Sequence, residues 1–127
     1  MVANKMRLRA FLAAALACGI AGGAMAQQKT SNGTGATLRA LDRTTGIVTD
    51  LQIAAGQSVE YERLTIALKE CRFPEGNLAL DAFALLEIHD KREATPRFSG
   101  WMIASSPALS ALEHPRYDVW LLQCTKS

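Results

Sequence analysis

Near its C-terminus the chain carries the stretch Tyr117-Asp118-Val119-Trp120-Leu121-Leu122-Gln123-Cys124, which decides the fold class. In an extended strand Trp120 and Cys124 share one face, and Val119 and Leu121 share the other. Apolar residues on both faces are typical of a strand that is buried on both sides. The stretch therefore predicts a central strand.

Short runs with β-like patterns fill the sequence upstream of this strand. Turn residues separate them at close intervals, which is typical of a sandwich or a small barrel. We expect one all-β domain over residues 36–127, an antiparallel sandwich or barrel of about 6–7 short strands. The predicted strands cover residues 37–41, 47–53, 59–61, 64–72, 82–88, 97–103 and 117–124.

Two irregular features are expected within this pattern. Residues 42–46 predict a hairpin loop in which Gly46 takes a positive φ angle. In the run 64–72, Cys71 falls off the main apolar stripe. Either a bulge near Glu70 or burial of both faces at that end would reconcile the cysteine with a core position.

One short helix of about two turns is expected between the last two strands, over residues 105–115. Ser106 followed by a proline is typical of an N-cap and a first helical position. The proline after His114 disfavours helical geometry at that residue. In such a helix Leu109 and Leu112 would face the sheet, and His114 would cap the C-terminus.

The N-terminal residues 1–26 have the pattern of a secretory signal: a basic start, an apolar run and the small residues Ala24 and Ala26 before the cut. The apolar run is shorter than the roughly 20 residues of a membrane-spanning helix, so we expect cleavage and no transmembrane anchor. Residues 27–35 then predict a flexible tether, and the domain is expected in the periplasm. Lipid attachment at Cys18 is a minor alternative.

The charge balance changes when the signal is removed. The whole chain has 14 basic and 12 acidic residues, but three basic residues and no acidic ones lie in residues 1–26. The remaining residues have a net charge of about −1. This balance gives no support to nucleic-acid binding, and no motif indicates a cofactor.

Cys71 and Cys124 are the two cysteines that remain after cleavage. In an oxidising compartment a distant pair is most simply a structural disulfide. A metal site or a redox motif is the competing interpretation, but it would need closely spaced cysteines or histidines.

Nucleophilic catalysis could use Ser105, Ser106 or Ser110 with His114 as base and Asp118 to orient it. No G-x-S-x-G turn surrounds these serines. We therefore predict no catalytic residues and keep the hydrolase as an alternative.

A metal site could combine His89, Asp90, His114 and Asp118, but their spacing matches no known ligand pattern. Asp90 is more simply a turn residue that follows a strand. No metal site is predicted.

The aromatic residues Trp101, Tyr117 and Trp120 could form a platform for a sugar or a peptide, or they could fill the core. For Trp120 the core is favoured, with the ring near the disulfide. For Trp101 the two interpretations are nearly even.

The C-terminal third carries a long motif, Gly100-Trp101-Met102-Ile103-Ala104-Ser105-Ser106-Pro107-Ala108-Leu109, continued by Ala111-Leu112-Glu113-His114-Pro115-Arg116-Tyr117-Asp118-Val119-Trp120. With Ala40-Leu41-Asp42, Gly46, the Gly56-Gln57 turn, the run 64–71 and Cys124, it resembles the domain of unknown function family 2155, small exported bacterial proteins. The Pro-rich segment that many members carry after the first cysteine is shortened here to residues 73–77. The resemblance implies the module and its cysteine pair, and it implies no activity.

We therefore expect a non-enzymatic envelope module that binds a protein or a cell-wall component, without an assigned oligomeric state. One alternative is a small hydrolase that uses His114 with a nearby serine, and another is a structural accessory subunit of an envelope complex. The expected binding surface consists of Trp101, Ser105, Ser106, His114 and Tyr117.

Overall fold

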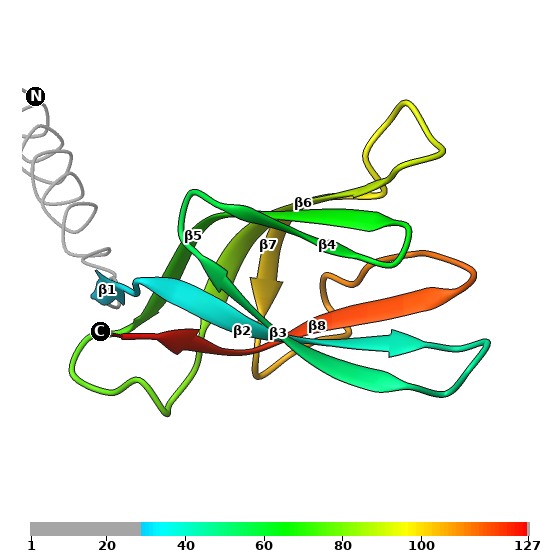
Figure 1. Cartoon of the computed structure of the whole chain (residues 1–127). Helices are drawn as coiled ribbons and strands as arrows, with labels where there is room; N and C mark the ends of the chain where they lie inside the picture. Colours follow the sequence, from blue (N-terminus) through cyan, green and yellow to red (C-terminus); the bar gives the residue numbers. More distant parts are fainter. Residues whose placement is uncertain (1–28, 127) are drawn as a thin grey trace, which may run out of the picture.

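The computed structural model describes residues 29–126, which form eight strands in two antiparallel sheets (Figure 1). The all-β prediction is confirmed, and the sheets do not close into a barrel. The strands are β1 (Thr30–Asn32), β2 (Gly35–Asp42), β3 (Val48–Ala54), β4 (Ser58–Tyr61), β5 (Leu64–Pro74), β6 (Phe83–Asp90), β7 (Phe98–Ile103) and β8 (Tyr117–Thr125). The predicted signal and Cys18 lie outside the described residues.

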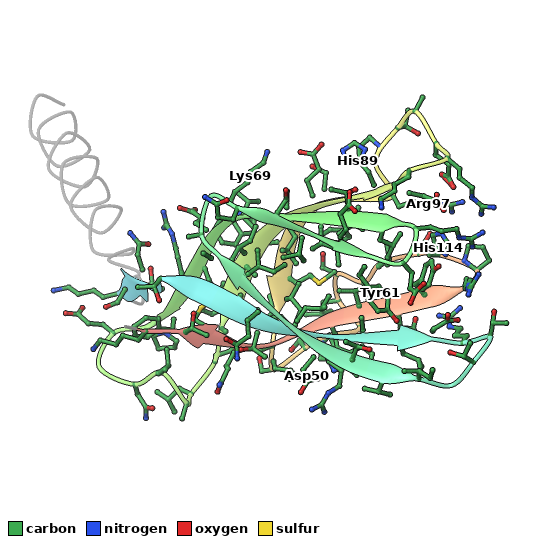
Figure 2. The ribbon with its side chains drawn as sticks, viewed as in Figure 1. Asp50, Tyr61, Lys69, His89, Arg97 and His114 are labelled. Atoms are coloured by element: carbon green, nitrogen blue, oxygen red, sulfur yellow. A yellow bond between two sulfur atoms is a disulfide. The ribbon has the colours of Figure 1, made fainter. Side chains whose placement is uncertain are left out.

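The larger sheet has the order β1-β5-β6-β7, with β4 also paired to β5, and the smaller sheet has the order β3-β2-β8. Alternate residues of β2, β5, β6 and β8 face inward and form one core between the sheets. Figure 2 shows Lys69 and Asp50 on opposite outer sides of the domain, above the larger sheet and below the smaller one.

The helix predicted over residues 105–115 is wrong, because the described part of the chain contains no helix. The Leu109 amide donates to the Ser106 carbonyl at 3.1 Å, so one turn forms and does not continue. Leu109 is 77% exposed and Leu112 only 4%, so the two leucines do not share a buried face. A nucleus of one turn is costly, and this connection must also cross from the larger sheet to the smaller one.

β1 lies within residues 27–35, which the sequence predicts as a tether. It pairs with the end of β5, where Ser31 lies opposite Phe73. The Gly33 amide donates to the Cys71 carbonyl at 2.7 Å. A Cβ atom on Gly33 would lie 2.8 Å from the Thr125 carbonyl oxygen, so this close approach requires glycine.

Two bulges bring both cysteines into the core. The register of β5 against β6 shifts between Leu68 and Glu70, which confirms the predicted bulge and makes Cys71 fully buried. A second shift, opposite Thr37 and Leu38, changes the face of Cys124 in β8. Cys124 therefore joins Val119 and Leu121 in the core, and the predicted common face with Trp120 is wrong.

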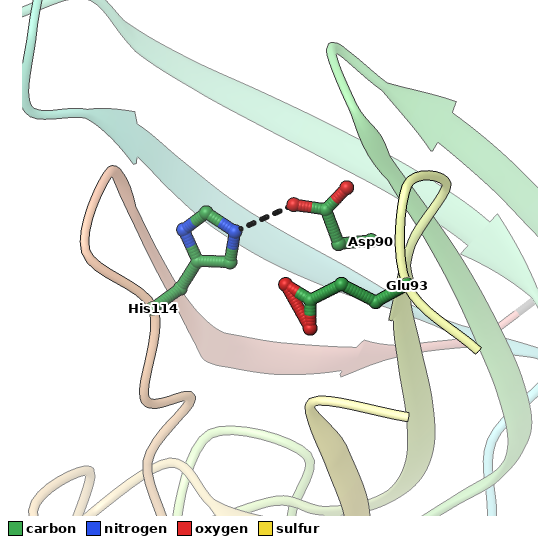
Figure 3. Close-up of side chains that lie close together, drawn as sticks. All are labelled: Asp90, Glu93 and His114. Carbon is green, nitrogen blue, oxygen red and sulfur yellow. Dashed lines mark hydrogen bonds and ion pairs between the residues drawn. The ribbon is translucent and has the colours of Figure 1, made fainter. Parts of the chain in front are cut away.

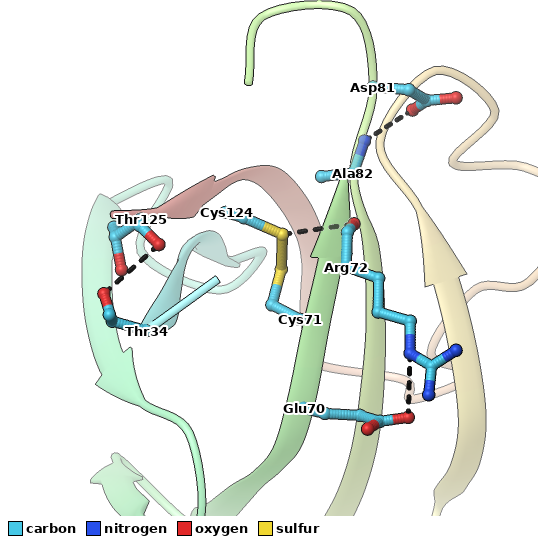
Figure 4. The surroundings of a disulfide bond; sticks show 8 residues. All are labelled: Thr34, Glu70, Cys71, Arg72, Asp81, Ala82, Cys124 and Thr125. Carbon is cyan, nitrogen blue, oxygen red and sulfur yellow. Dashed lines mark hydrogen bonds and ion pairs between the residues drawn. A yellow bond between two sulfur atoms is a disulfide. The ribbon is translucent and has the colours of Figure 1, made fainter. Parts of the chain in front are cut away.

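The structure joins Cys71 and Cys124 in a disulfide with a Cα–Cα distance of 5.7 Å (Figure 4). Cys71 belongs to β5 of the larger sheet and Cys124 to β8 of the smaller one. The disulfide is thus a covalent link between the two layers. The hairpin prediction also holds, since Gly46 has a φ of 75° in the loop between β2 and β3.

Candidate functional site

Asp90 and His114 form a buried pair (Figure 3). Asp90 lies opposite Leu64 at the start of β5, whereas Cys71 lies near the end of that strand, so the pair and the disulfide are at opposite ends of the sandwich. Asp90 continues the inward alternation of β6 after Leu86 and Ile88, so it is the last residue of that strand rather than a turn residue. The His114 Nε2 atom lies 2.9 Å from Asp90 Oδ2, and both side chains are 1% exposed or less.

The tautomer of His114 follows from its backbone contacts. Its Nδ1 atom accepts hydrogen bonds from the amides of Arg116 at 3.0 Å and Tyr117 at 3.4 Å. An Nδ1 that accepts cannot carry a proton, so Nε2 carries it and donates to Asp90. Both ring nitrogens are therefore occupied, and the prediction of His114 as a helix cap is replaced by this role in the core.

The Asp90 carboxylate is held in its charged form. The hydrogen bond from His114, together with one from the Arg92 amide at 3.0 Å, lowers the pKa of Asp90 to about 2 although burial opposes the shift. Asp90 is thus an acceptor that orients the imidazole, and it is not a proton donor near neutral pH.

Glu93 lies beside this pair, and ligand atoms of Asp90, Glu93 and His114 lie within 4.8 Å of one another (Figure 3). A metal would need Nε2 of His114 without its proton, which would move a proton onto Nδ1 against two amide donors. Glu93 also accepts hydrogen bonds from two donors of Arg97, from Nη2 to Oε1 at 2.7 Å and from Nε to Oε2 at 2.8 Å. The cluster therefore fits a hydrogen-bonded network better than a metal centre.

The other residues weighed for a metal are placed elsewhere. The ring of His89 lies 2.7 Å from Glu87 and is 38% exposed, and Asp118 forms an ion pair with Arg43. The structure brings together only Asp90 and His114 of that set.

A second ion pair closes the same end of the molecule. The Arg116 guanidinium donates to Asp42 at 2.9 and 3.1 Å, and this contact lowers the pKa of Asp42. Tyr61 and Tyr117 meet edge to face with ring centroids 5.6 Å apart, and Figure 2 shows Tyr61 between the sheets. We call Asp42, Asp90, His114, Arg116 and Tyr117 the polar end.

The serine, His114 and Asp118 weighed for the alternative hydrolase do not form a catalytic group. The Ser105 hydroxyl donates to Asp81 Oδ2 at 2.7 Å, and its amide donates to Oδ1 of the same residue at 3.0 Å. His114 is engaged with Asp90, and Asp118 with Arg43. The geometry thus provides neither an activated serine nor an accessible base.

The three aromatic residues weighed as a platform lie in three different layers. Tyr117 is fully buried in the core. Trp101 alternates with the buried Met102 and lies on the outer face of the larger sheet, where it is 39% exposed. Trp120 alternates with Val119 and Leu121 and lies half-buried on the outer face of the smaller sheet, so its predicted place in the core is wrong.

Trp101 is the centre of an apolar strip on its sheet. It lies opposite Leu85 in the register, and Ile103 lies opposite Phe83. All four side chains alternate with buried residues and remain at least partly exposed. We call Phe83, Leu85, Trp101 and Ile103 the Trp101 patch.

The expected binding surface is therefore divided. Trp101 and Ser105 are exposed and Ser106 is half-buried, whereas His114 and Tyr117 are structural residues of the polar end. The sequence interpretation missed Phe83, Leu85 and Ile103. Their apolar character at outward positions of β6 and β7 was the available signal.

Comparisons with known proteins give a family without a described activity. A family model described as an uncharacterized protein conserved in bacteria (DUF2155) matches residues 36–124. The uncharacterized protein RP359 of Rickettsia prowazekii (strain Madrid E) is 28% identical over 96 residues, which cover 73% of this chain and 62% of that protein. The chain thus spans less than two thirds of this relative. No solved structure matches. Within residues 29–126, no helix is long and apolar enough to cross a membrane.

Proposed function

The chain belongs to the bacterial DUF2155 family, and we propose that it acts as a non-enzymatic, protein-binding module of the cell envelope. The observation that carries this proposal is the Trp101 patch, an apolar strip across two neighbouring strands of the larger sheet. Exposed apolar area of this kind, with charged residues at its border, is typical of protein-binding surfaces.

The charged border includes the type of residue that dominates binding energies. The guanidinium of Arg72 lies 5.8 Å from the centre of the Trp101 ring, and Arg72 Nε lies 3.4 Å from Glu70. Tryptophan and arginine are enriched among the residues whose truncation costs most at interfaces.

A protein is a better match to this surface than a cell-wall sugar. Stacking of a sugar needs a free ring face, and Arg72 already lies over the Trp101 ring. Three surface hollows of 260 to 320 Å³ within the described residues are all lined by other side chains. None of these three hollows includes a residue of the Trp101 patch, and an exposed sheet face suits the broad surface of another protein.

The same observations argue against the hydrolase but are compatible with the accessory subunit. The hydrolase would require His114 to reach a substrate, but its side chain is 1% exposed and both nitrogens are occupied. An accessory subunit of an envelope complex would use the same patch with a longer-lived partner, so it differs from our proposal in the lifetime of the complex.

Trp101→Ala tests the proposal. The tagged protein is recovered from envelope extract after chemical cross-linking, beside the matched variant Val48→Ala. Val48 is also an outward apolar residue, 53% exposed, but lies on the smaller sheet. We expect Trp101→Ala to lose a partner that Val48→Ala and the wild type retain, at unchanged thermal stability.

The partner must then bind purified protein with the same dependence on Trp101. Retention of every partner by Trp101→Ala would overturn the proposal. If the domain sediments with purified peptidoglycan and Trp101→Ala does not, the ligand of the patch is a cell-wall component and not a partner protein.

The location in the envelope is a separate part of the proposal. Intact mass and free thiols of protein purified from the envelope fraction test it. A mass that begins at Gln27 with no free thiol supports cleavage and a periplasmic domain. A lipid-bearing mass that begins at Cys18 would place the protein on a membrane instead.

A further inference from the structure

β7 is an edge strand of the larger sheet, and in the described part of the chain no strand pairs with its outer side. The Ala104 amide donates to the Ala82 carbonyl at 2.9 Å, and the register of β7 against β6 continues from this pair without a shift. Residues of an antiparallel strand alternate between those that bond to the neighbour and those that do not. The amides and carbonyls of Ser99, Trp101 and Ile103 therefore point away from β6.

The edge of β7 is accessible. Ser99 is exposed, and Trp101 is 39% exposed. Outside the strand ladders of residues 29–126, no backbone–backbone hydrogen bond uses Ser99 or Trp101. The Ile103 carbonyl accepts one hydrogen bond, from the Ser106 amide at 3.2 Å, and a carbonyl oxygen has two lone pairs. An added strand could thus bond to β7 at three alternate residues.

β7 also lacks the features that protect an exposed edge. Free edges commonly carry charged residues, proline or a bulge. The edge strand β3 of the smaller sheet carries Asp50, whose side chain is 48% exposed. β7 contains no charged residue and no proline, and its register has no shift. The larger sheet therefore has an edge that can pair with another chain.

Gly100 lies in the middle of this edge strand. Its φ of 153° is a conformation that residues with a side chain rarely adopt. Glycine weakens the interior of a strand, and it often marks a place where another backbone approaches closely. Beyond its chain neighbours, no atom of the described residues lies within 4 Å of the position that a Cβ on Gly100 would occupy. A close approach at Gly100 would therefore come from outside this chain.

The surroundings of β7 favour a second copy over a foreign segment. A segment that is added to an edge is selected by pockets for its alternate side chains, but no residue of β7 lines any of the three hollows described above. A second copy needs no pocket, because a two-fold axis makes the edge complementary to itself.

The alternation along β7 places this axis at Trp101. The two Trp101 residues then exchange both of their backbone hydrogen bonds, and Ser99 of each copy bonds to Ile103 of the other. Gly100 stands opposite Met102 of the second copy in a non-hydrogen-bonded pair, where the Cα atoms approach to about 4.5 Å. The glycine thus lies where the two backbones come closest.

We propose that two copies of this protein pair through β7, antiparallel about a two-fold axis at Trp101, so that the two larger sheets become one continuous sheet. Edge pairing leaves the outer face of the sheet free, and the two Trp101 patches then lie side by side. Specific interfaces commonly use roughly 20 to 30 residues a side, more than one patch supplies. The joined patch, which is the only part that rests on the proposed function, would double the apolar surface offered to a partner.

Sedimentation of the protein purified from the envelope fraction, over a range of concentrations, tests the pairing. We expect a monomer–dimer equilibrium, with slower hydrogen exchange at the Ser99 and Trp101 amides as the dimer forms. Ser99→Pro removes an outward amide without removing a bond to β6, and it should weaken dimerisation about tenfold or more. Ser99→Ala keeps the amide and should dimerise as the wild type does. Thermal unfolding of both variants verifies that they are folded.

Trp101→Lys and Trp101→Glu test the position of the axis. Each variant alone places two like charges directly opposite each other, so each should dimerise about fivefold more weakly or worse. Mixed in equal amounts, the two variants should form a one-to-one heterodimer, because opposite charges then meet across the axis. A mixture that stays monomeric, or either variant that dimerises as the wild type does, would contradict this pairing.

A protein that stays monomeric at every concentration, or a dimer that leaves exchange at the Ser99 and Trp101 amides unchanged, would overturn the proposal. Protection of these two amides by an envelope partner in a monomer would assign the edge to a different protein. Trp101→Ala keeps the backbone of β7 and should dimerise. A monomer whose partner capture depends on Trp101 would therefore reject the dimer and retain the proposed function, and a dimer whose partners do not depend on Trp101 would do the reverse.

Discussion

The two ends of the sandwich hold the same sheets together by different chemistry. At one end, which we call the disulfide end, Cys71 and Cys124 join β5 to β8 by a covalent bond. At the polar end, Asp90 of β6 meets His114, just before β8, through one hydrogen bond within a network that includes Asp42 and Arg116. A small sandwich can thus be held together at one end by a covalent bond that does not depend on pH, and at the other end by hydrogen bonds to charged carboxylates.

The two ends also differ in what could break them. The disulfide depends on an oxidising environment and is insensitive to moderate acid. The polar end is insensitive to reductant, but it requires Asp90 in the charged form and His114 with one particular tautomer. Reduction of the disulfide should therefore leave the hydrogen bonds of the polar end in place, and acid should leave the disulfide in place.

Removal of the disulfide should have the largest effect. Cys71→Ala together with Cys124→Ala opens a sequence separation of 53 residues, for which loop-closure entropy gives about 4 kcal/mol of lost stability. Urea denaturation at several pH values measures the loss, which should be similar from pH 5 to pH 8. If the free energy of unfolding of the double variant is within about 1 kcal/mol of the wild-type value, the two sheets stay together through the polar end and the core without the disulfide.

His114→Ala should have the next largest effect. It removes a hydrogen bond to a charged, buried acceptor and leaves Asp90 without its partner, which we expect to cost about 2 to 3 kcal/mol. The matched variant His89→Ala removes a half-exposed ring paired with Glu87 and should change stability by less than about 0.5 kcal/mol. Equal losses in the two variants would contradict the distinction between a structural and a surface histidine.

How much of these two ends the sequence predicts depends on the residue type. Two distant cysteines in a chain with the pattern of a secretory signal have few alternatives, so Cys71 and Cys124 could be paired from the sequence. Asp90 and His114 are 24 residues apart, and no spacing rule joins them. The one available signal was a carboxylate at an inward position of β6, after Leu86 and Ile88.

The fold shows the same division. Alternating patterns located β2 to β8 but not β1. The positive φ of Gly46 was predicted from local chemistry, and a bulge near Glu70 was one of two predicted alternatives. The second bulge, in β8, could not be seen, because both registers of an apolar strand look alike until its partner is known. The helix prediction is wrong for a related reason. The local signals around Ser106 specify one turn, and the path from the larger sheet to the smaller one determines the conformation of the remaining residues of the connection.

Acid should separate the two ends most clearly. The pKa of Asp90 is lowered to about 2 in the folded protein by the hydrogen bond from His114, below its ordinary value of 3.8. A lowered pKa stabilises the fold fully above the unfolded value, and this stabilisation is lost as the pH falls from about 4 toward 2. Denaturation midpoints at pH 6, 4, 3 and 2 should fall less steeply in Asp90→Asn than in the wild type.

Asp50→Asn is the matched control for this experiment. Asp50 also accepts a hydrogen bond from a basic side chain, that of Arg39, but the Asp50 side chain is 48% exposed. Solvent screens such a pair, so its removal should change the slope of the acid transition much less. A slope that changes as much in Asp50→Asn as in Asp90→Asn would locate the acid sensitivity on the surface rather than at the polar end.

The smallest expected effect concerns the hydroxyl of Tyr117, which lies at the centre of the polar end. Tyr117 is fully buried, and its hydroxyl oxygen has no hydrogen-bond partner among the described residues. A buried polar atom without a partner carries a desolvation penalty, whereas phenylalanine keeps the ring and its contact with Tyr61. Tyr117→Phe should therefore leave stability unchanged or raise it by up to about 1 kcal/mol, measured by urea denaturation. A clear loss of stability would show that a water molecule forms a hydrogen bond with this hydroxyl. The hydrogen-bond network of the polar end would then include buried water as well as the charged side chains.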